Sequence, residues 1–296
     1  MADAHHQHLI QTLVAAQGVA VIMGGPDTGK TTLARQMLTE AAARGVAAAY
    51  VDADVAQSTI GPPTCAGLRW VRSSGDLDTL HIADEMRFVG STDPSRLVLQ
   101  MVIATATLVE KAREHADFIV VDTTGTVSGV IGETLKYHKI ELTRPDHIVC
   151  IQRGSELEPI IGMLRRFFSA DVITTSVHPE LVPGSADERE FARRQQFAAA
   201  LAEPLEAWRV RPTVFAPTLP AGLDLARMDR VLVGVQDGMG RCLGLGVLTH
   251  DDDVLRVLTN HGEGMQGLRL GSVRVDLSEH TTAPVNLRQV MFGVEI

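Results

Sequence analysis

The chain has 296 residues, of which 45% are hydrophobic and 21% are charged, and its formal net charge is −9 at pH 7. This length suits one large domain, or a large domain with a small companion, and the composition is typical of globular enzymes. The acidic balance argues against a broad nucleic-acid-binding surface but allows an enzyme that grips only the end of a strand. No apolar run approaches the ~18 residues that a membrane span needs.

The first 17 residues lack a basic segment followed by an apolar core, so we expect an N-terminal tail, 1–17, and no secretory signal. The segment His5–His8, HHQH, is assigned no role, because isolated terminal clusters are more often disordered. The three cysteines, Cys65, Cys150 and Cys242, lack the spacing of metal ligands. They fit a reducing compartment, so a cytoplasmic location is expected.

Apolar runs then alternate with amphipathic stretches up to about residue 205. A short run, Val19–Met23, leads into a glycine loop, and a helical stretch begins at Lys30. Further buried strands are predicted at 46–54, 117–125, 146–154 and 171–177. This alternation predicts the α/β class: a parallel sheet of P-loop NTPase type, with helices on both faces, in a domain over residues 18–205.

From about Pro204 the chain becomes rich in proline, and helical periodicity disappears. Arg230–Leu248 is predicted to form two strands around a turn at Asp237 and Gly238, and Ser272–Leu277 a further short strand. We therefore expect a small β-rich C-terminal domain over residues 210–296, in which no catalytic constellation is recognisable.

The loop GGPDTGKTTLARQML, which starts at Gly24, matches the phosphate-binding pattern G-x-x-x-x-G-K-[ST] between a strand and a helix. Backbone N–H groups, the helix N-terminus and Lys30 would surround an anion. Thr31 would offer a hydroxyl to Mg²⁺ between the β- and γ-phosphates. We expect a nucleoside triphosphate to bind here, held by Gly25, Pro26, Asp27, Thr28, Gly29, Lys30, Thr31 and Thr32.

Two of the predicted strands end in acidic residues. In VDADVAQST, strand alternation would point Asp52 and Asp54 the same way, one to hold Mg²⁺ and the other to accept a proton from an attacking hydroxyl. In FIVVDTTG, Asp122 competes with Asp52 for the metal, and Thr124 and Gly125 offer a hydroxyl and N–H groups near the γ-phosphate or the acceptor. The alternative is an acidic strand end that only caps the next turn.

The helical stretch Ser185–Phe197 carries Arg189, Arg193 and Arg194, the first two one turn apart on one face. Such a helix could close over a triphosphate and neutralise charge in the transition state. Spacing alone favours the other interpretation, a solvated helix on which neighbouring glutamates offset the arginines.

Together these segments resemble the polynucleotide 5′-hydroxyl kinase family, which includes the eukaryotic pre-mRNA-cleavage and ribosomal-RNA-processing kinases and smaller archaeal and bacterial members. Gly25–Leu33 is similar to the family's P-loop, Asp52–Pro63 to its D-x-D-x-G-Q segment, and Asp122–Gly129 to its clasp. The resemblance covers roughly residues 18–200 and is weaker in the C-terminal part. Two departures are Ala56, in place of a glycine, and Thr126, where many members carry a tryptophan that stacks on the substrate.

The resemblance implies Mg²⁺-dependent transfer of the γ-phosphate of ATP or GTP to the 5′-hydroxyl of end-exposed or single-stranded RNA or DNA. It makes Asp54 the general base and the helix near 185–200 a lid. The catalytic residues implied are Lys30, Asp54, Arg189, Arg193 and Arg194. Substrate contacts are implied for Gln57, Thr124, Gly125 and Thr126, and metal contacts for Thr31, Asp52 and Asp122.

Two competing hypotheses remain. A regulatory P-loop NTPase, which drives assembly or metal delivery without a nucleic-acid substrate, would need no general base for a sugar hydroxyl. A nucleotide-binding scaffold would have lost catalysis, against which the set of Lys30, Thr31, Asp52 and Asp54 argues.

Overall fold

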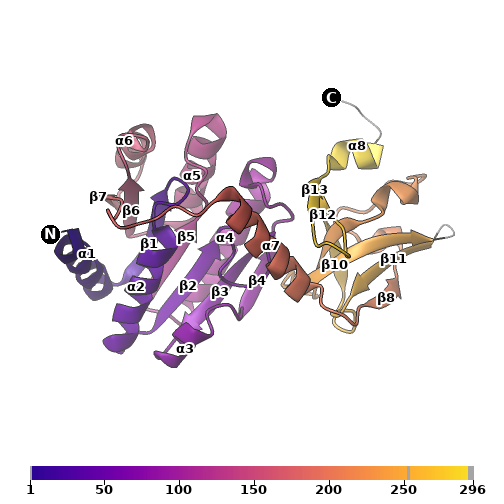
Figure 1. Cartoon of the computed structure of the whole chain (residues 1–296), viewed down its shortest axis with the longest axis horizontal. Helices are drawn as coiled ribbons and strands as arrows, with labels where there is room; N and C mark the ends of the chain where they lie inside the picture. Colours follow the sequence, from indigo (N-terminus) through magenta and orange to yellow (C-terminus); the bar gives the residue numbers. More distant parts are fainter. Residues whose placement is uncertain (1, 252–253, 293–296) are drawn as a thin grey trace.

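A computed structural model describes residues 2–251 and 254–292, and it contains two sheets that lie next to each other along the long axis (Figure 1). The first sheet has seven strands in the order β4-β3-β2-β5-β1-β6-β7. Its strands are β1 (Gly18–Gly24), β2 (Ala48–Ala53), β3 (Cys65–Val71), β4 (Glu85–Phe88), β5 (Phe118–Thr123), β6 (His147–Gln152) and β7 (Asp171–Ser176).

The five strands β2, β5, β1, β6 and β7 are parallel, and they match the strands that the apolar runs predict. The strands β3 and β4 pair antiparallel at one edge and were not predicted. The β3 sequence, CAGLRWV, mixes small and polar residues in a segment rich in glycine and proline, so it gives no continuous apolar signal. The predicted α/β class is confirmed, with a sheet that is mostly parallel.

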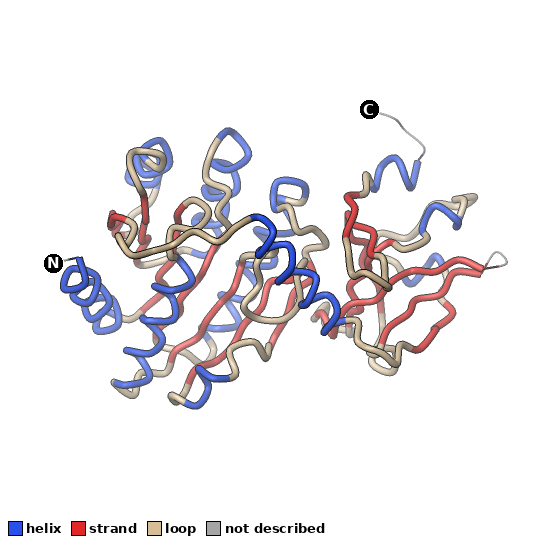
Figure 2. Tube along the Cα trace, in the orientation of Figure 1, coloured by secondary structure: helices blue, strands red, loops and turns tan. Residues whose placement is uncertain are grey.

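Helices cover both faces of this sheet (Figure 2). Along β1, Ala20 and Ile22 join the core under one set of helices, while Val21 and Met23 join the core under the other set. The first set is α1 (Ala2–Ala16), α2 (Lys30–Ala43) and α3 (Gly75–Asp78); the second is α4 (Val98–Arg113), α5 (Gly129–Thr143) and α6 (Glu158–Phe167). Among the helices of the described residues, none has both the length and the apolar character that crossing a bilayer requires.

The segment for which the sequence predicts a tail contains helix α1. Leu9, Ile10, Leu13 and Val14 are buried in the same core as α2, because their spacing gives the helix one apolar stripe. The histidines and glutamines around them hide this stripe in the sequence. Helix α1 is therefore part of the layer next to the P-loop helix.

The second sheet is antiparallel, in the order β13-β12-β9-β10-β11-β8. Its strands are β8 (Glu206–Arg209), β9 (Val231–Gln236), β10 (Cys242–Asp251), β11 (Val254–Thr259), β12 (Gly267–Val275) and β13 (Thr282–Pro284), and a short helix α8 (Leu287–Phe292) follows. The predicted hairpin around Asp237 and Gly238 is β9–β10. Strand β8 precedes residue 210, and the exact domain boundaries stay a prediction.

Helix α7 (Ala186–Ala200) leads from the first sheet to the second (Figure 1). Phe197 at its C-terminal end is fully buried in a cluster that takes Cys65 and Phe88 from the first sheet and Leu232 and Cys242 from the second. The sulfur atoms of Cys65 and Cys242 are 3.9 Å apart. This shared core anchors the end of α7 and joins the two sheets.

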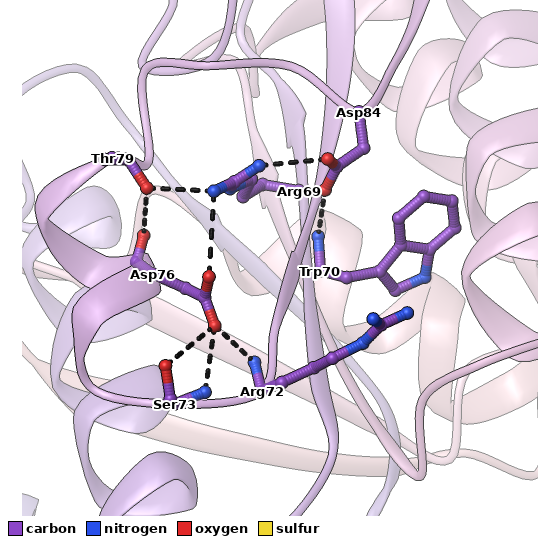
Figure 3. A network of polar contacts seen from close by, with 7 residues as sticks. All are labelled: Arg69, Trp70, Arg72, Ser73, Asp76, Thr79 and Asp84. Atoms are coloured by element: carbon purple, nitrogen blue, oxygen red, sulfur yellow. Dashed lines mark hydrogen bonds and ion pairs between the residues drawn. The ribbon is translucent and has the colours of Figure 1, made fainter.

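A polar network closes the antiparallel edge of the first sheet (Figure 3). Arg69 of β3 donates to Asp84 at 2.9 Å and to the Thr79 hydroxyl at 2.8 Å. Asp76 of α3 accepts two hydrogen bonds of 2.9 Å from the backbone N–H groups of residues 72–73. These bonds fix β3. They therefore also fix the end of the loop that connects β2 to β3, which lies at the carboxyl end of the parallel strands.

The join between the sheets gives a test of the fold. Gly234 of β9 lies against Phe88, and a methyl group on Gly234 would be 2.3 Å from the Phe88 Cγ. Because Phe88 is 1% exposed, it cannot move aside easily. We expect Gly234→Ala to lower the free energy of unfolding by about 1–3 kcal/mol, the usual cost of overpacking. Gly238→Ala is the control, since its methyl group would be 3.9 Å from the nearest atom. Equal denaturation midpoints for the two variants would contradict this contact.

Candidate active site

The glycine loop lies at the carboxyl end of β1, flanked by the ends of β5 and β6. Gly29 has a φ of +88°, a left-handed conformation that favours glycine and lets the chain turn into α2. The Lys30 ammonium donates to the Gly25 carbonyl at 2.7 Å. Burial lowers the pKa of Lys30, and the Asp122 carboxylate opposes this shift. The loop therefore offers a concave, positively charged surface that suits an anion.

A cavity of about 480 Å³ opens in front of this loop. Its wall combines the P-loop with the segment after β2, the clasp after β5 and α7: Pro26, Asp27, Thr28, Gly29, Lys30, Thr31, Thr32, Asp54, Ala56, Gln57, Pro94, Thr124, Gly125, Thr126, Leu181, Val182, Arg189 and Arg193. The predicted site residues outside this wall are Gly25, Asp52, Asp122 and Arg194. Four segments far apart in sequence thus meet at one site.

Asp122, at the end of β5, lies directly behind Thr31. Its Oδ2 accepts hydrogen bonds from the Thr31 hydroxyl at 2.5 Å and from the Tyr50 hydroxyl at 3.1 Å. Its Oδ1 is buried and has no hydrogen-bond partner among the described residues. Burial raises the pKa of Asp122, and the Thr31 hydroxyl and Lys30 oppose the rise. A hydroxyl beside an unsatisfied carboxylate oxygen is the hard ligand set that Mg²⁺ prefers, so these residues fit the ion.

Asp52 does not line this cavity. Its Oδ1 accepts from the Asp54 N–H at 2.9 Å, and its Oδ2 accepts from the N–H groups of Thr59 and, at 3.0 Å, Ile60. Burial raises the pKa of Asp52 to about 8, and the backbone N–H groups oppose the rise. Because β2 ends at Ala53, strand alternation does not extend to Asp54, and the two carboxylates do not point the same way. The geometry gives Asp52 the task of closing the loop after β2.

Asp54 is half-buried in the wall of the cavity. Its Oδ1 accepts hydrogen bonds from the N–H groups of Ala56, at 3.0 Å, and Gln57, at 3.2 Å. This turn fixes the carboxylate and brings Gln57 to the same wall. A carboxylate held in this way can accept a proton from a hydroxyl bound in the cavity.

The clasp packs directly on the P-loop. A Cβ on Gly125 would be 2.7 Å from the Pro26 nitrogen, so only glycine fits there. The Thr124 hydroxyl is buried and has no hydrogen-bond partner among the described residues. Lys136 of α5, fully buried, donates to Thr123 Oγ1 at 2.7 Å and to the Thr124 carbonyl at 2.8 Å. The clasp is thus held from behind by a buried lysine that sequence reasoning missed.

Helix α7 brings two arginines to the cavity. Arg189 donates to Asp27 of the P-loop at 2.7 Å and to the Gly184 carbonyl at 2.8 Å. Arg193 lines the same cavity, whereas Arg194 pairs with Glu190 at 2.7 Å outside it. Spacing alone favours a solvated helix, but it cannot show which face of the helix meets the P-loop. The pair at the cavity is Arg189 and Arg193.

Two further contacts position this helix and the loop beneath it. The Gln196 amide of α7 donates to the Ser58 carbonyl at 2.6 Å, which ties the helix to the loop that carries Asp54. Arg153, just after β6, donates to the carbonyl groups of Pro26, at 3.2 Å, and Asp27. Sequence reasoning missed Arg153, although a basic residue at the carboxyl end of a parallel strand is a signal for this position.

Lys139 of α5, one turn from Lys136, gives a test of the electrostatics behind the site. Lys139 is 1% exposed, its Nζ has no hydrogen-bond partner among the described residues, and burial lowers its pKa to about 8. Between that value and the ordinary lysine pKa of ~10.4, the unfolded chain binds the proton more tightly, so the stability of the protein should rise with pH in this window.

Lys139→Met removes the buried charge. We expect it to raise the free energy of unfolding at neutral pH by roughly 1–4 kcal/mol and to flatten the rise above pH ~8. The measurement is denaturant unfolding across pH, with Lys111→Met, at an exposed lysine of α4, as the control. If the free energy of unfolding of Lys139→Met matched that of the wild type at every pH, Lys139 would not be an uncompensated cation.

Comparison with known proteins places this geometry in a family. The family described as mRNA cleavage and polyadenylation factor CLP1 P-loop matches residues 24–200. A polyribonucleotide 5′-hydroxyl-kinase of Pyrococcus furiosus is 26% identical, over 92% of this chain and 86% of its own length. Another, of Methanocaldococcus jannaschii, is 27% identical, over 86% of each chain.

Solved structures agree on the fold. In two structures of Clp1p with Pcf11p, the matching chain superposes with TM-scores of 0.68 and 0.71 at 14% and 13% identity. The matches cover 92% and 93% of this chain and 79% and 80% of the solved chains. At this identity the likeness shows the fold alone, whereas the family match spans more than half of the chain. The chain belongs to the CLP1 P-loop family.

Proposed function

We propose that this chain is a polynucleotide 5′-hydroxyl kinase, which transfers the γ-phosphate of ATP or GTP to the 5′-hydroxyl end of RNA or DNA. The observation that carries the proposal is that one cavity joins the phosphate-binding loop to the Asp54 carboxylate and to Arg189 and Arg193. The loop alone is enough to bind the phosphates of a nucleotide. A carboxylate and two arginines around the same cavity suit transfer of a phosphoryl group to an acceptor.

In the proposed reaction, the backbone of the loop and Lys30 bind the β- and γ-phosphates of the donor. Thr31 and Asp122 would hold Mg²⁺, which neutralises charge on these phosphates when it is bound. The 5′-oxygen of the acceptor forms a bond to the γ-phosphorus as the bond to the β,γ-bridging oxygen breaks. Asp54 takes the proton of the 5′-hydroxyl, and the nucleoside diphosphate leaves.

The acceptor end would lie between Asp54 and the clasp, in contact with Gln57, Thr124, Gly125 and Thr126. All four residues line the same cavity as Asp54 and the two arginines, which supports this role. The Thr124 hydroxyl, which is buried and has no hydrogen-bond partner in the described part of the chain, is suited to a phosphate oxygen or the acceptor. Lys30, Arg189 and Arg193 place positive charge at this cavity in a chain of net charge −9, which fits an enzyme that holds only a strand end.

When the donor is bound, its phosphates would replace Asp27 as the hydrogen-bond partner of Arg189. A phosphate carries more negative charge than a carboxylate and accepts bidentate hydrogen bonds from a guanidinium group. The capping box of α7, in which Ser185 and Glu188 bond each other's backbone, keeps the helix formed while the side chain changes partner. The competing hypothesis, a regulatory NTPase, is not favoured, because the relatives above are named as kinases.

The role of Asp54 is tested by Asp54→Asn. The amide oxygen of the variant can still accept the two backbone hydrogen bonds, but the side chain cannot take a proton. We expect nucleotide binding to persist and kcat for oligonucleotide phosphorylation to fall by roughly 10²–10⁴-fold. Asp237→Asn is the control, because Asp237 also accepts two backbone N–H groups in a turn, far from this cavity. Near-normal kcat for Asp54→Asn at saturating substrates would exclude Asp54 as the base.

The lid is tested by Arg189→Ala and Arg193→Ala. If these arginines act on the transferring phosphate, kcat should fall by ~10²-fold or more, with a smaller change in KM for ATP. Arg194→Ala gives the comparison within the helix and should cost much less, since Arg194 pairs with Glu190. Steady-state kinetics in which all three variants keep the wild-type kcat would refute the lid.

A further inference from the structure

A second cavity of about 480 Å³ adjoins the first at the P-loop. The two share Thr28, Gly29, Thr32 and Leu181, so they adjoin along the same loop. The remaining walls of the second cavity come from α1, from α2 and from the ends of β6 and β7. No role in the mechanism above uses this space.

The two cavities differ in chemistry. The first is lined by Lys30, Asp27, Asp54 and two arginines, whereas Glu180 is the one Asp, Glu, Lys or Arg side chain on the wall of the second, as formed by the described residues. Apolar side chains give the second cavity much of its surface: Ile10, Leu33, Ile151 and Leu181. Its size is that of a site for a small organic ligand, and its wall combines these apolar side chains with polar ones.

Leu181 marks the boundary between the two. Its Cδ atoms lie 3.7 and 3.8 Å from the place where a Cβ on Gly29 would be, so the side chain covers the turn into α2. The segment that carries Leu181 connects β7 to α7 and runs past the P-loop (Figure 1). The same connection therefore forms part of both cavities.

The direction of a bound triphosphate follows from the first cavity. Thr31, Asp122 and Asp54 mark the end of the loop that receives the γ-phosphate. The α-phosphate and the nucleoside must then extend towards Thr32 and away from Asp54. We propose that the second cavity binds the ribose and nucleobase of the phosphate donor; this inference rests on the proposed function, which supplies the direction.

Flat and amide-bearing side chains at this cavity suit a nucleobase. The rings of His6 and His178 are stacked, with centroids 5.8 Å apart and planes 29° apart, and they join α1 to the connection after β7. A nucleobase stacks on such aromatic faces. Gln7 of α1 and Gln36 of α2 line the same space, and each amide offers the donor and the acceptor that the edge of a base requires.

The test is equilibrium binding by calorimetry, with Mg²⁺ and without an acceptor. For the double variant Gln7→Ala/Gln36→Ala, we expect Kd for ATP to rise about 5- to 20-fold, as the loss of two hydrogen bonds implies. Kd for inorganic tripolyphosphate, which fills only the phosphate cradle, should stay unchanged. Gln11→Ala is the matched control, since Gln11 is exposed one turn from Gln7 on α1 but does not line the cavity.

Unchanged affinity for ATP in the double variant would overturn the assignment, and so would an equal loss for ATP and tripolyphosphate, which would mean damage to the P-loop. The outcome is separate from that of the kinase assay, because no phosphoryl transfer is measured. Selective loss of ATP binding, in a protein that phosphorylates no oligonucleotide, would support the cavity assignment and contradict the proposed function.

Discussion

The ionisable groups of Asp122 and Lys136 are buried at the carboxyl end of the first sheet, and the hydrogen bonds that they make inside the protein organise the site. An ion taken out of water costs several kcal/mol unless partners surround it. Asp122, 1% exposed on the strand next to β1, is held by the hydroxyls of Thr31 and Tyr50, and Lys136 bonds the end of the same strand. These contacts tie α2, the strands β2 and β5, and α5 to one another. Among the described residues, Asp122 Oδ1 has no hydrogen-bond partner, and in the proposed function Mg²⁺ and the donor phosphates would complete this centre.

The elements around this centre divide the space in front of the sheet. On one side, the wall contains Asp54 and the clasp; on the other, α1 and the end of β7 make a wall with few charged side chains. Helix α7 spans from the P-loop, where Arg189 bonds Asp27, to the shared core, where Phe197 is fully buried. Its far end is thus fixed by both sheets, while its cavity end depends on side-chain ion pairs. In the proposed function, a donor nucleotide whose phosphates occupy the P-loop would contact both walls and the cavity end of α7.

Much of this arrangement can be predicted from sequence, for identifiable reasons. The parallel strands are continuous apolar runs because helices bury both of their faces, and the P-loop is fixed by glycine and lysine spacing between a strand and a helix. Strands β3 and β4 and helix α1 gave weak signals, because small or polar residues interrupt their apolar stripes. Spacing cannot show that Asp52 turns back to the loop, since that depends on where β2 ends. Lys136 and Lys139 lie on a helix face beside Leu135 and Ile140, and only the fold brings that face behind the carboxylates.

In the proposed reaction, the γ-phosphate leaves the P-loop for a nucleic-acid end. The most direct measurement offers γ-labelled ATP and Mg²⁺ to the full chain together with an oligonucleotide that ends in a 5′-hydroxyl, in parallel with the same oligonucleotide bearing a 5′-phosphate. We expect label to enter the first oligonucleotide at its 5′ end and not to enter the second. Release of free labelled phosphate, with neither oligonucleotide labelled, would refute the kinase and indicate an NTPase.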